Sequence, residues 1–294
     1  MSQLHLNVHC HTFEFKINEW IEKLPYGVDY MRKYKGEVYY KVNVRKVSNK
    51  ERNTLKKVFE WLDTEFFMPM ITRMDIAFDE AQHDYTEYQK LNSALMNCII
   101  KTKSRIIGNT NNFHSTGQLT RNQERTMRFE SSDGKHIIEI YNKKVQKKGE
   151  TELDVRLEMR SCERAIAIED LIAEKENRCA LEWFGLLDRA TTDKNWNATE
   201  KAINADIMAE YERRKDEFKT FTSFLEHRGQ DIFNIDQLKA LYKDKGNKTA
   251  TARQNAHKFF EERKGIKIVE AEDLRAYVAK LRAAAADVGL IEKR

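Results

Sequence analysis

The sequence predicts an α+β fold, with an antiparallel central sheet and flanking helices followed by a mostly helical C-terminal part. Three observations predict it. Short runs in the first half alternate polar and apolar residues, as half-buried strands do. Two such runs are separated by the turn residues Asp133-Gly134, a strong hairpin signal. After Cys162 the apolar residues recur mostly at helix spacing.

The elements follow in order along the chain. Strands are predicted over residues 4–15, 37–45, 71–78, 126–130, 136–141 and 153–159, and helices over residues 53–67, 85–100, 235–243, 249–263 and 271–288. A short strand is expected at residues 266–269, and charged linkers around residues 191–200 and 211–219. The predicted domains are a catalytic sheet domain (1–165), a helical connecting region (166–230) and a helix-turn-helix-like region (231–294).

Composition narrows the class of protein. The 294 residues are 40% hydrophobic and 34% charged with a net charge of +5, which fits a globular protein and is compatible with a polyanionic partner. No apolar run approaches a membrane span of roughly 20 residues, and no signal-peptide pattern opens the chain, so we expect a cytoplasmic protein. The four cysteines form no CxxC pair, and no phosphate-loop or nucleophile-elbow motif is present.

Three predicted strands carry charged residues on one face and aliphatic residues on the other. The polar faces hold Arg73, Asp75 and Asp79 in the first strand, Glu139 and Tyr141 in the second, and Asp154, Arg156, Glu158 and Arg160 in the third. A solvated sheet face produces the same alternation, so the pattern alone leaves structure and function as open alternatives.

The residue types on these faces fit one chemistry. A tyrosine can attack a DNA phosphodiester when its phenol is polarised and the charge developing on phosphorus is neutralised. A hard divalent cation, Mg²⁺ or Mn²⁺, held by carboxylate oxygens can supply that neutralisation. Lys143 and Lys144, which follow Tyr141 closely, could contact a phosphate oxygen or assist the phenol.

In their order and rough spacing the same strands resemble the three motifs of rolling-circle replication initiators. The motifs are Thr72-Arg-Met-Asp-Ile-Ala-Phe78, Ile138-Glu-Ile-Tyr-Asn-Lys-Lys144 and Val155-Arg-Leu-Glu-Met-Arg160. They are similar to the R-x-D, Y-x-K and R-x-E motifs of the Rep_trans initiators of small plasmids and of the filamentous-phage initiators. The resemblance extends over most of residues 70–290, because three further segments are similar to the C-terminal region of the phage proteins: Gly246-Asn-Lys-Thr249, Phe259-Phe260 and Asp273-Leu-Arg-Ala-Tyr277.

The resemblance implies a nickase. Tyr141 would cut and rejoin one origin strand through a covalent 5′-phosphotyrosine, with Lys143 and Lys144 beside it. Asp75 and Glu158 would be the metal ligands. The weaker candidate ligands are Glu139 and Asp79, since family members need not carry an acid there.

The resemblance also implies partners. Arg73 and Arg156 are expected to contact origin DNA, which would be bound as duplex and as a single-stranded or hairpin segment. A host helicase and DNA polymerase in a bacterial cytoplasm are implied, and a homodimer stays open. Gln146 departs from the plasmid pattern, which often has glutamate there, so the resemblance assigns no role to that position and leaves the role of Tyr141 unaffected. Two alternatives remain: a conjugative relaxase of the same chemistry, and a non-enzymatic DNA-binding repressor.

Two histidines match a competing signature. Val8-His-Cys-His11 fits the His-hydrophobe-His motif of another class of rolling-circle nickases, in which both histidines hold the metal. Alternation places His9 and His11 on the same side of their strand. Because few residues precede the motif, polar-face histidines are the simpler interpretation. They would join the site only if this strand lies next to that of Asp75.

The C-terminal part contains two predicted helices joined across Gly246-Asn247, close to helix-turn-helix spacing. Ala252, Ala256 and Phe259 form the inward stripe of the second helix. The residues expected to contact DNA are Lys248, Thr251, Arg253, Gln254 and Lys258. Residues 242–265 hold seven lysines and arginines against three acids, a balance that suits phosphate and major-groove contacts. A solvated basic helix is the alternative.

Overall fold

The computed structural model describes residues 5–24, 28–43, 61–62, 64–65, 69–81, 85–101, 113–116, 126–130, 136–142, 155–167, 178–262, 268–287 and 291. The chain divides into two compact units. The first comprises residues 1–82, 103–185 and 279–294, and the second comprises residues 83–102 and 186–278. Over the ranges given, no helix is both long and apolar enough to cross a membrane.

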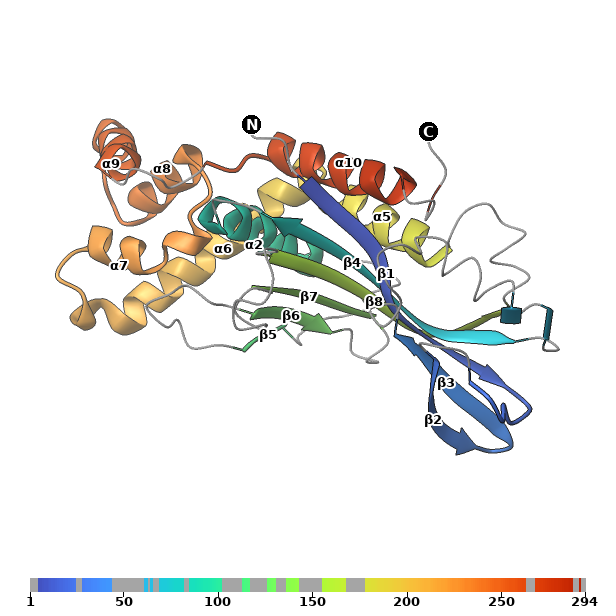
Figure 1. The fold of residues 1–294 in the computed structure, drawn as a ribbon. Coiled ribbons are helices and arrows are strands. Elements are labelled where there is room, and N and C mark those ends of the chain that lie inside the picture. Colours follow the sequence, from blue (N-terminus) through green and yellow to red (C-terminus); the bar gives the residue numbers. More distant parts are fainter. Residues whose placement is uncertain are drawn as a thin grey trace. The chain divides into compact units, whose positions relative to one another are not determined.

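An antiparallel sheet forms the first unit, as Figure 1 shows. Within the described ranges it has eight strands in the order β2-β3-β1-β4-β8-β7-β6-β5. The strands are β1 (His5–Ile17), β2 (Val28–Tyr34), β3 (Glu37–Asn43), β4 (Met70–Ala81), β5 (Phe113–Thr116), β6 (Thr126–Glu130), β7 (His136–Asn142) and β8 (Val155–Ala167). The predicted α+β class with an antiparallel central sheet is confirmed.

The structure corrects the predicted strands in three places. The sequence does not predict strands β2 and β5. In β2, six of the seven residues are exposed, so neither face shows an apolar alternation, and β5 is only four residues long. Strand β8 continues past Cys162, where a change to helix was predicted. Its last residues pair with the start of β4, Met70 opposite Ala167 and Ile71 opposite Ile166, and this pairing extends the strand.

The apolar face of the central strands forms the core of the first unit. Buried side chains come from adjacent strands: Met74, Ile76, Phe78, Ile138, Ile140, Leu157 and Met159. The helix α5 (Arg178–Ala190) adds Trp183 and Phe184 from this unit. The Phe184 ring meets the Phe78 ring edge-on with centroids 6.2 Å apart, and the Trp183 indole N–H donates to Ser161 Oγ at 2.8 Å.

Helices make up the second unit. They are α2 (Tyr85–Lys101), α6 (Asp193–Arg214), η2 (Lys215–Glu217), α7 (Phe221–His227), η3 (Gly229–Asp231), α8 (Ile235–Asp244) and α9 (Thr249–Glu262); α10 (Ala271–Asp287) has residues in both units. The predicted linker around residues 191–200 is wrong, because residues 193–214 form one helix. Of the linker predicted around residues 211–219, residues 211–214 end this helix, and residues 215–219 do connect α6 to α7 through η2. Thr192 caps α6 by accepting from Asn195 N, and its buried residues include Trp196, Ile203 and Ile207.

Helices α8 and α9 agree with the predicted pair. Gly246 in the turn between them has φ +95°, a conformation that glycine adopts without strain. Ala252, Ala256 and Phe259 are buried, as the stripe predicted. Of the predicted strand at 266–269, residues 266–267 lie outside the described part, and residues 268–269 are not in a strand. The predicted helix at 53–67 falls mostly outside the described residues, and the four residues described there are helical.

Candidate active site

Adjacent strands β4, β8 and β7 bring the predicted site residues into three neighbouring rows. The rows are Asp79–Arg156–Tyr141, Ala77–Glu158–Glu139 and Asp75–Arg160–Ile137. Directly opposed residues in antiparallel strands share a face, and so do residues two positions apart in one strand. Residues from motifs far apart along the chain therefore meet on one surface of the sheet.

Tyr141 lies against a carboxylate on this surface. Its hydroxyl donates a hydrogen bond to Glu158 Oε2 at 3.3 Å, and its side chain is 8% exposed. Burial raises the pKa of the Tyr141 phenol to about 12, while the nearby charge of Arg156 acts in the opposite direction. At neutral pH the phenol is thus protonated, with Glu158 in place to accept its proton.

A chain of ion pairs runs from Glu158 along the same face. Arg160 bridges two acids: Nη2 donates to Glu158 Oε1 at 3.0 Å and Nε donates to Asp75 Oδ1 at 3.2 Å. Arg73 donates to both oxygens of Asp75, at 2.8 and 2.6 Å. Arg73 Nη1 also reaches Glu14 Oε1 at 3.0 Å. From one end to the other, these ion pairs connect Glu158, Arg160, Asp75, Arg73 and Glu14.

A second ion pair is completely enclosed. Arg156 and Asp79 each have no exposed surface, and Arg156 donates to both carboxylate oxygens of Asp79 through Nε and Nη2. Glu158 is 5% exposed and Asp75 1% exposed. The polar face is therefore not a solvated one, which is one of the two alternatives that the alternation of the sequence leaves open. Buried ionic networks add little stability and are frequent at functional sites.

The placed carboxylates do not fit a metal ion as they stand. Both oxygens of Asp75 accept hydrogen bonds from arginines, and both oxygens of Asp79 accept from Arg156. In the part of the chain that the structure describes, no three His, Cys, Asp or Glu side chains come together to hold a metal. The expectation of Mg²⁺ or Mn²⁺ stays a prediction.

The remaining predicted residues are placed less completely. Glu139 stands opposite Glu158 in the register and is partly exposed. Strand β1 does pair with β4, with His9 opposite Ala77 and a register shift at His11, so the strand order required for the histidines is met. The side chains of His9 and His11 lie outside the described residues, as do Lys143 and Lys144 altogether.

The sequence alone assigns no role to two residues of this ionic chain, Arg160 and Glu14. Arg160 was placed on the polar face, but nothing in the local pattern showed that it bridges two acids. Glu14 stands opposite Arg73 in the β1–β4 register. Its alternation in β1 was a usable signal, since it shares a face with Thr12 and Lys16.

Comparison with known proteins identifies the segment that carries this site. A model of the Rep_trans family, described as replication initiation factor, matches residues 69–227, just over half of the chain. Among solved structures, the rolling circle replication initiator protein from Geobacillus stearothermophilus is similar, with a TM-score of 0.41 and 14% sequence identity over 63% of this chain and 85% of that chain. A search of curated proteins finds no match.

Proposed function

The chain belongs to the replication initiation factor family, and on that basis we propose that it nicks and rejoins one strand of a rolling-circle origin through Tyr141. The observation that carries the proposal is the contact between the Tyr141 hydroxyl and Glu158 inside the matched segment. A nucleophile and a base within hydrogen-bond reach are what a covalent phosphoryl transfer needs.

The proposed reaction exchanges one phosphodiester bond of the DNA for an ester to Tyr141. Tyr141 Oη attacks phosphorus and forms a Tyr–O–P ester while the bond from phosphorus to the 3′ oxygen breaks. The phenol proton passes to Glu158 and then to the departing 3′ oxygen, leaving a free 3′ hydroxyl and a 5′ phosphate on Tyr141. The ester conserves the energy of the broken bond, so attack by a 3′ hydroxyl rejoins the strand without ATP.

Two partly exposed arginines would neutralise the phosphate. Arg160 and Arg73 are 19% and 20% exposed, and guanidinium groups match phosphate oxygens well. Arg73 is therefore retained as a DNA contact. Arg156 is fully enclosed with Asp79, so the predicted DNA contact would require that pair to open. In its present position Arg156 acts on Tyr141, because its charge lowers the pKa that burial raises.

Duplex recognition is proposed for α9. Its outward face and the residue before it are exposed at all five predicted contact positions: Lys248, Thr251, Arg253, Gln254 and Lys258. An initiator has to find its origin before cutting, and a basic helix face provides phosphate and base-edge contacts. A host helicase, a DNA polymerase and a homodimer remain proposals that rest on the family alone.

The deciding experiment replaces the nucleophile. A labelled origin oligonucleotide and a supercoiled origin plasmid are incubated with the wild type, with Tyr141→Phe and with Tyr30→Phe as a matched control. We expect a covalent adduct and a relaxed plasmid for the wild type and the control. Tyr141→Phe should give neither and should still bind origin DNA in a gel-shift assay.

Different outcomes would overturn different parts of the proposal. An adduct in Tyr141→Phe, or one mapped by mass spectrometry to another tyrosine, removes Tyr141 as nucleophile. Binding without any cleavage by the wild type favours a repressor, and cleavage only at a transfer origin favours a relaxase. A parallel series with Mg²⁺, Mn²⁺ or a chelator tests the predicted metal separately, and full activity in chelator would refute that prediction alone.

A further inference from the structure

The hairpin formed by β2 and β3 carries an exposed aromatic and basic surface. Among the described residues, five large hydrophobic side chains are exposed, and four of them belong to this hairpin or the segment leading into it: Trp20, Tyr30, Met31 and Tyr34. Tyr34 and Trp20 are each 57% exposed. All four precede residues 69–227, so the family match assigns them no role.

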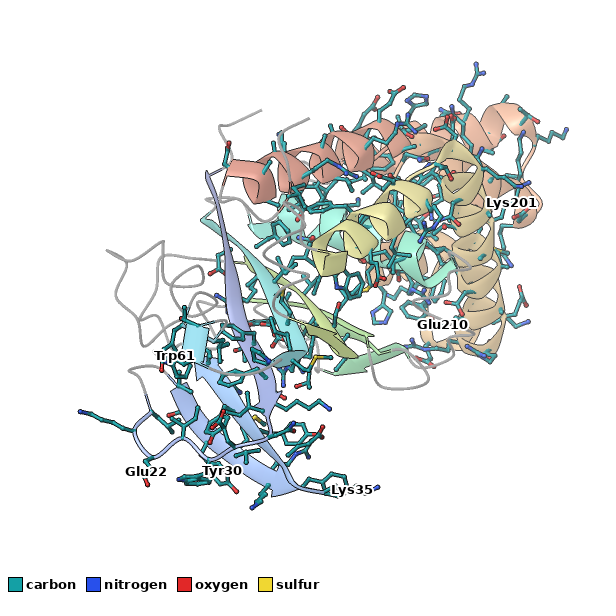
Figure 2. All side chains as sticks on the ribbon, turned by 90° about the vertical axis from the view of Figure 1, so that its right-hand side faces the viewer. Glu22, Tyr30, Lys35, Trp61, Lys201 and Glu210 are labelled. Carbon is teal, nitrogen blue, oxygen red and sulfur yellow. The ribbon has the colours of Figure 1, made fainter. Side chains whose placement is uncertain are left out.

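The hairpin presents these side chains on a defined scaffold. Lys35 and Gly36 form its two-residue turn with φ of +50° and +86°, as in the tight turns that follow the twist of two paired strands. Figure 1 shows β2 and β3 projecting at one end of the sheet, and Figure 2 shows Tyr30 and Lys35 on this projection. The tip is therefore an outlying part of the sheet that ends in a regular tight turn.

Cations and rings alternate along the hairpin. The Lys35 ammonium lies 5.3 Å from the centroid of the Tyr34 ring, and the Arg32 guanidinium lies 4.9 Å from that of Tyr39. Between Tyr30 and Gly36 there are three cations and no acid. This segment is complementary to a phosphate backbone, and its exposed ring offers a flat apolar face.

The register connects this surface to the candidate active site. Arg32 and Lys16 both stand opposite Tyr39, on either side of β3. Glu14, two residues before Lys16, stands opposite Arg73. These residues therefore occupy the same face of the sheet as the ionic chain that ends at Glu158. A polar face thus runs across β8, β4, β1 and β3 to β2.

We propose that the hairpin surface made by Arg32, Tyr34 and Lys35 binds single-stranded DNA, with a base stacked on Tyr34 and phosphates on the two cations. Base faces are available in a single strand and hidden in a duplex, so an exposed ring among cations favours the single strand. The identity of this strand, the one continuing from the nick, rests on the proposed function. The binding surface itself rests on the hairpin.

The test measures affinity for labelled oligothymidine by fluorescence anisotropy, using full-length protein. Tyr34→Ala should weaken binding by about tenfold, in the range found when one stacked base loses its aromatic partner. Tyr34→Phe keeps the aromatic ring and should bind oligothymidine as tightly as the wild type. Arg32→Ala combined with Lys35→Ala should lower the slope of log affinity against log salt by about 1.4, from roughly 0.7 per single-strand phosphate contact.

The matched control is Trp20→Ala. Trp20 is as exposed as Tyr34, but its ring packs against that of Tyr30 at a tilt of 57°, with centroids 4.9 Å apart. Tyr30 stands opposite the buried Tyr40, so this pair belongs to the other face. This variant should bind oligothymidine like the wild type. Unchanged affinity in Tyr34→Ala, an equal loss in Trp20→Ala, or an equal loss for duplex of the same length would each overturn the proposal.

Failure of this inference and failure of the proposed function give different results. On an oligonucleotide too short to reach the hairpin, the hairpin variants should form the Tyr141 adduct as fast as the wild type. If the adduct forms and the variants bind oligothymidine normally, only the hairpin proposal fails. If no adduct forms and Tyr34→Ala loses affinity, the nicking proposal fails and the single-strand surface stands.

Discussion

Replacing Glu158 by Gln separates two effects that the structure places in one contact. The substitution removes the carboxylate that accepts from the Tyr141 hydroxyl at 3.3 Å and keeps an oxygen acceptor of similar shape. Burial is the largest cause of the raised pKa of Tyr141, and the charge of Glu158 also raises it. Glu158→Gln should therefore lower the phenol pKa while it removes the general base.

The loss of the base should dominate near neutral pH. With the wild-type pKa of about 12, only about one Tyr141 phenol in ten thousand is ionised at about pH 8. In Glu158→Gln this pKa is lower, but burial, its largest cause, remains, so attack without a base still draws on a small ionised population. A positioned general base typically contributes about 10²–10⁴-fold in rate. We expect Glu158→Gln to slow adduct formation by that factor at neutral pH. The rate of the variant should then rise about tenfold for each pH unit as more of the phenol ionises.

Single-turnover adduct formation on a labelled oligonucleotide, followed by gel over a pH series, measures this directly. The control is Glu14→Gln, which removes the same charge from the far end of the ionic chain, where Glu14 pairs with Arg73. It should leave the shape of the pH profile unchanged. A Glu158→Gln rate equal to that of the wild type near pH 7 would refute the role of Glu158 as base.

Two further predictions concern the helical unit. Lys90 in α2 is 4% exposed, its Nζ makes no hydrogen bond in the described part of the chain, and burial lowers its pKa to about 7. The unfolded chain binds the ammonium proton of Lys90 more tightly than the folded protein does, so the charged lysine destabilises the fold. Lys90→Met should therefore raise the free energy of unfolding by up to about 5 kcal/mol below pH 7, and this gain should fade towards pH 10.5. Denaturant titrations that show an equal gain at every pH would contradict the prediction. In α9, the double substitution Arg253→Ala and Lys258→Ala should reduce the slope of log affinity against log salt for duplex origin DNA by about 1.8, as measured by gel shift. It should leave formation of the covalent adduct on single-stranded DNA unchanged. The control is Lys201→Ala in α6. An unchanged slope would exclude these residues from the phosphate contacts.

Local periodicity is enough to predict the strands that have one buried face. Strands β4 and β7 begin and end within a few residues of their predicted bounds, because alternation is set by the strand itself. Strand β2 gave no such signal, since only Val28 in it is buried. The sequence predicts linkers at the two ends of helix α6, because its buried residues are sparse in a strongly charged sequence, whereas packing makes the helix continuous.

The site was predictable only in part, for a related reason. Alternation placed Tyr141, Glu158 and Asp75 on polar faces, and the order of the motifs suggested that these faces meet. The partners of the acids follow from tertiary register: Arg160 reaches Asp75 across 85 positions of sequence. The burial of the network likewise depends on the assembled sheet. Neither the arginine occupation of Asp75 nor the enclosure of Arg156 can be read from spacing.

The charge of the buried network argues for separate binding and cutting surfaces. Its ion pairs join four carboxylates and three guanidinium groups, a formal charge of −1, from Glu14, Asp75, Asp79, Glu158, Arg73, Arg156 and Arg160. A cluster with that balance does not by itself attract a phosphodiester. Apart from the phosphate contacts proposed for Arg73 and Arg160, affinity for DNA then has to come mainly from cations outside the network, and the hairpin tip and the α9 face are basic surfaces of this kind. Variants of those surfaces should therefore change binding and its salt dependence, whereas variants of the network should change the rate of attack on bound DNA.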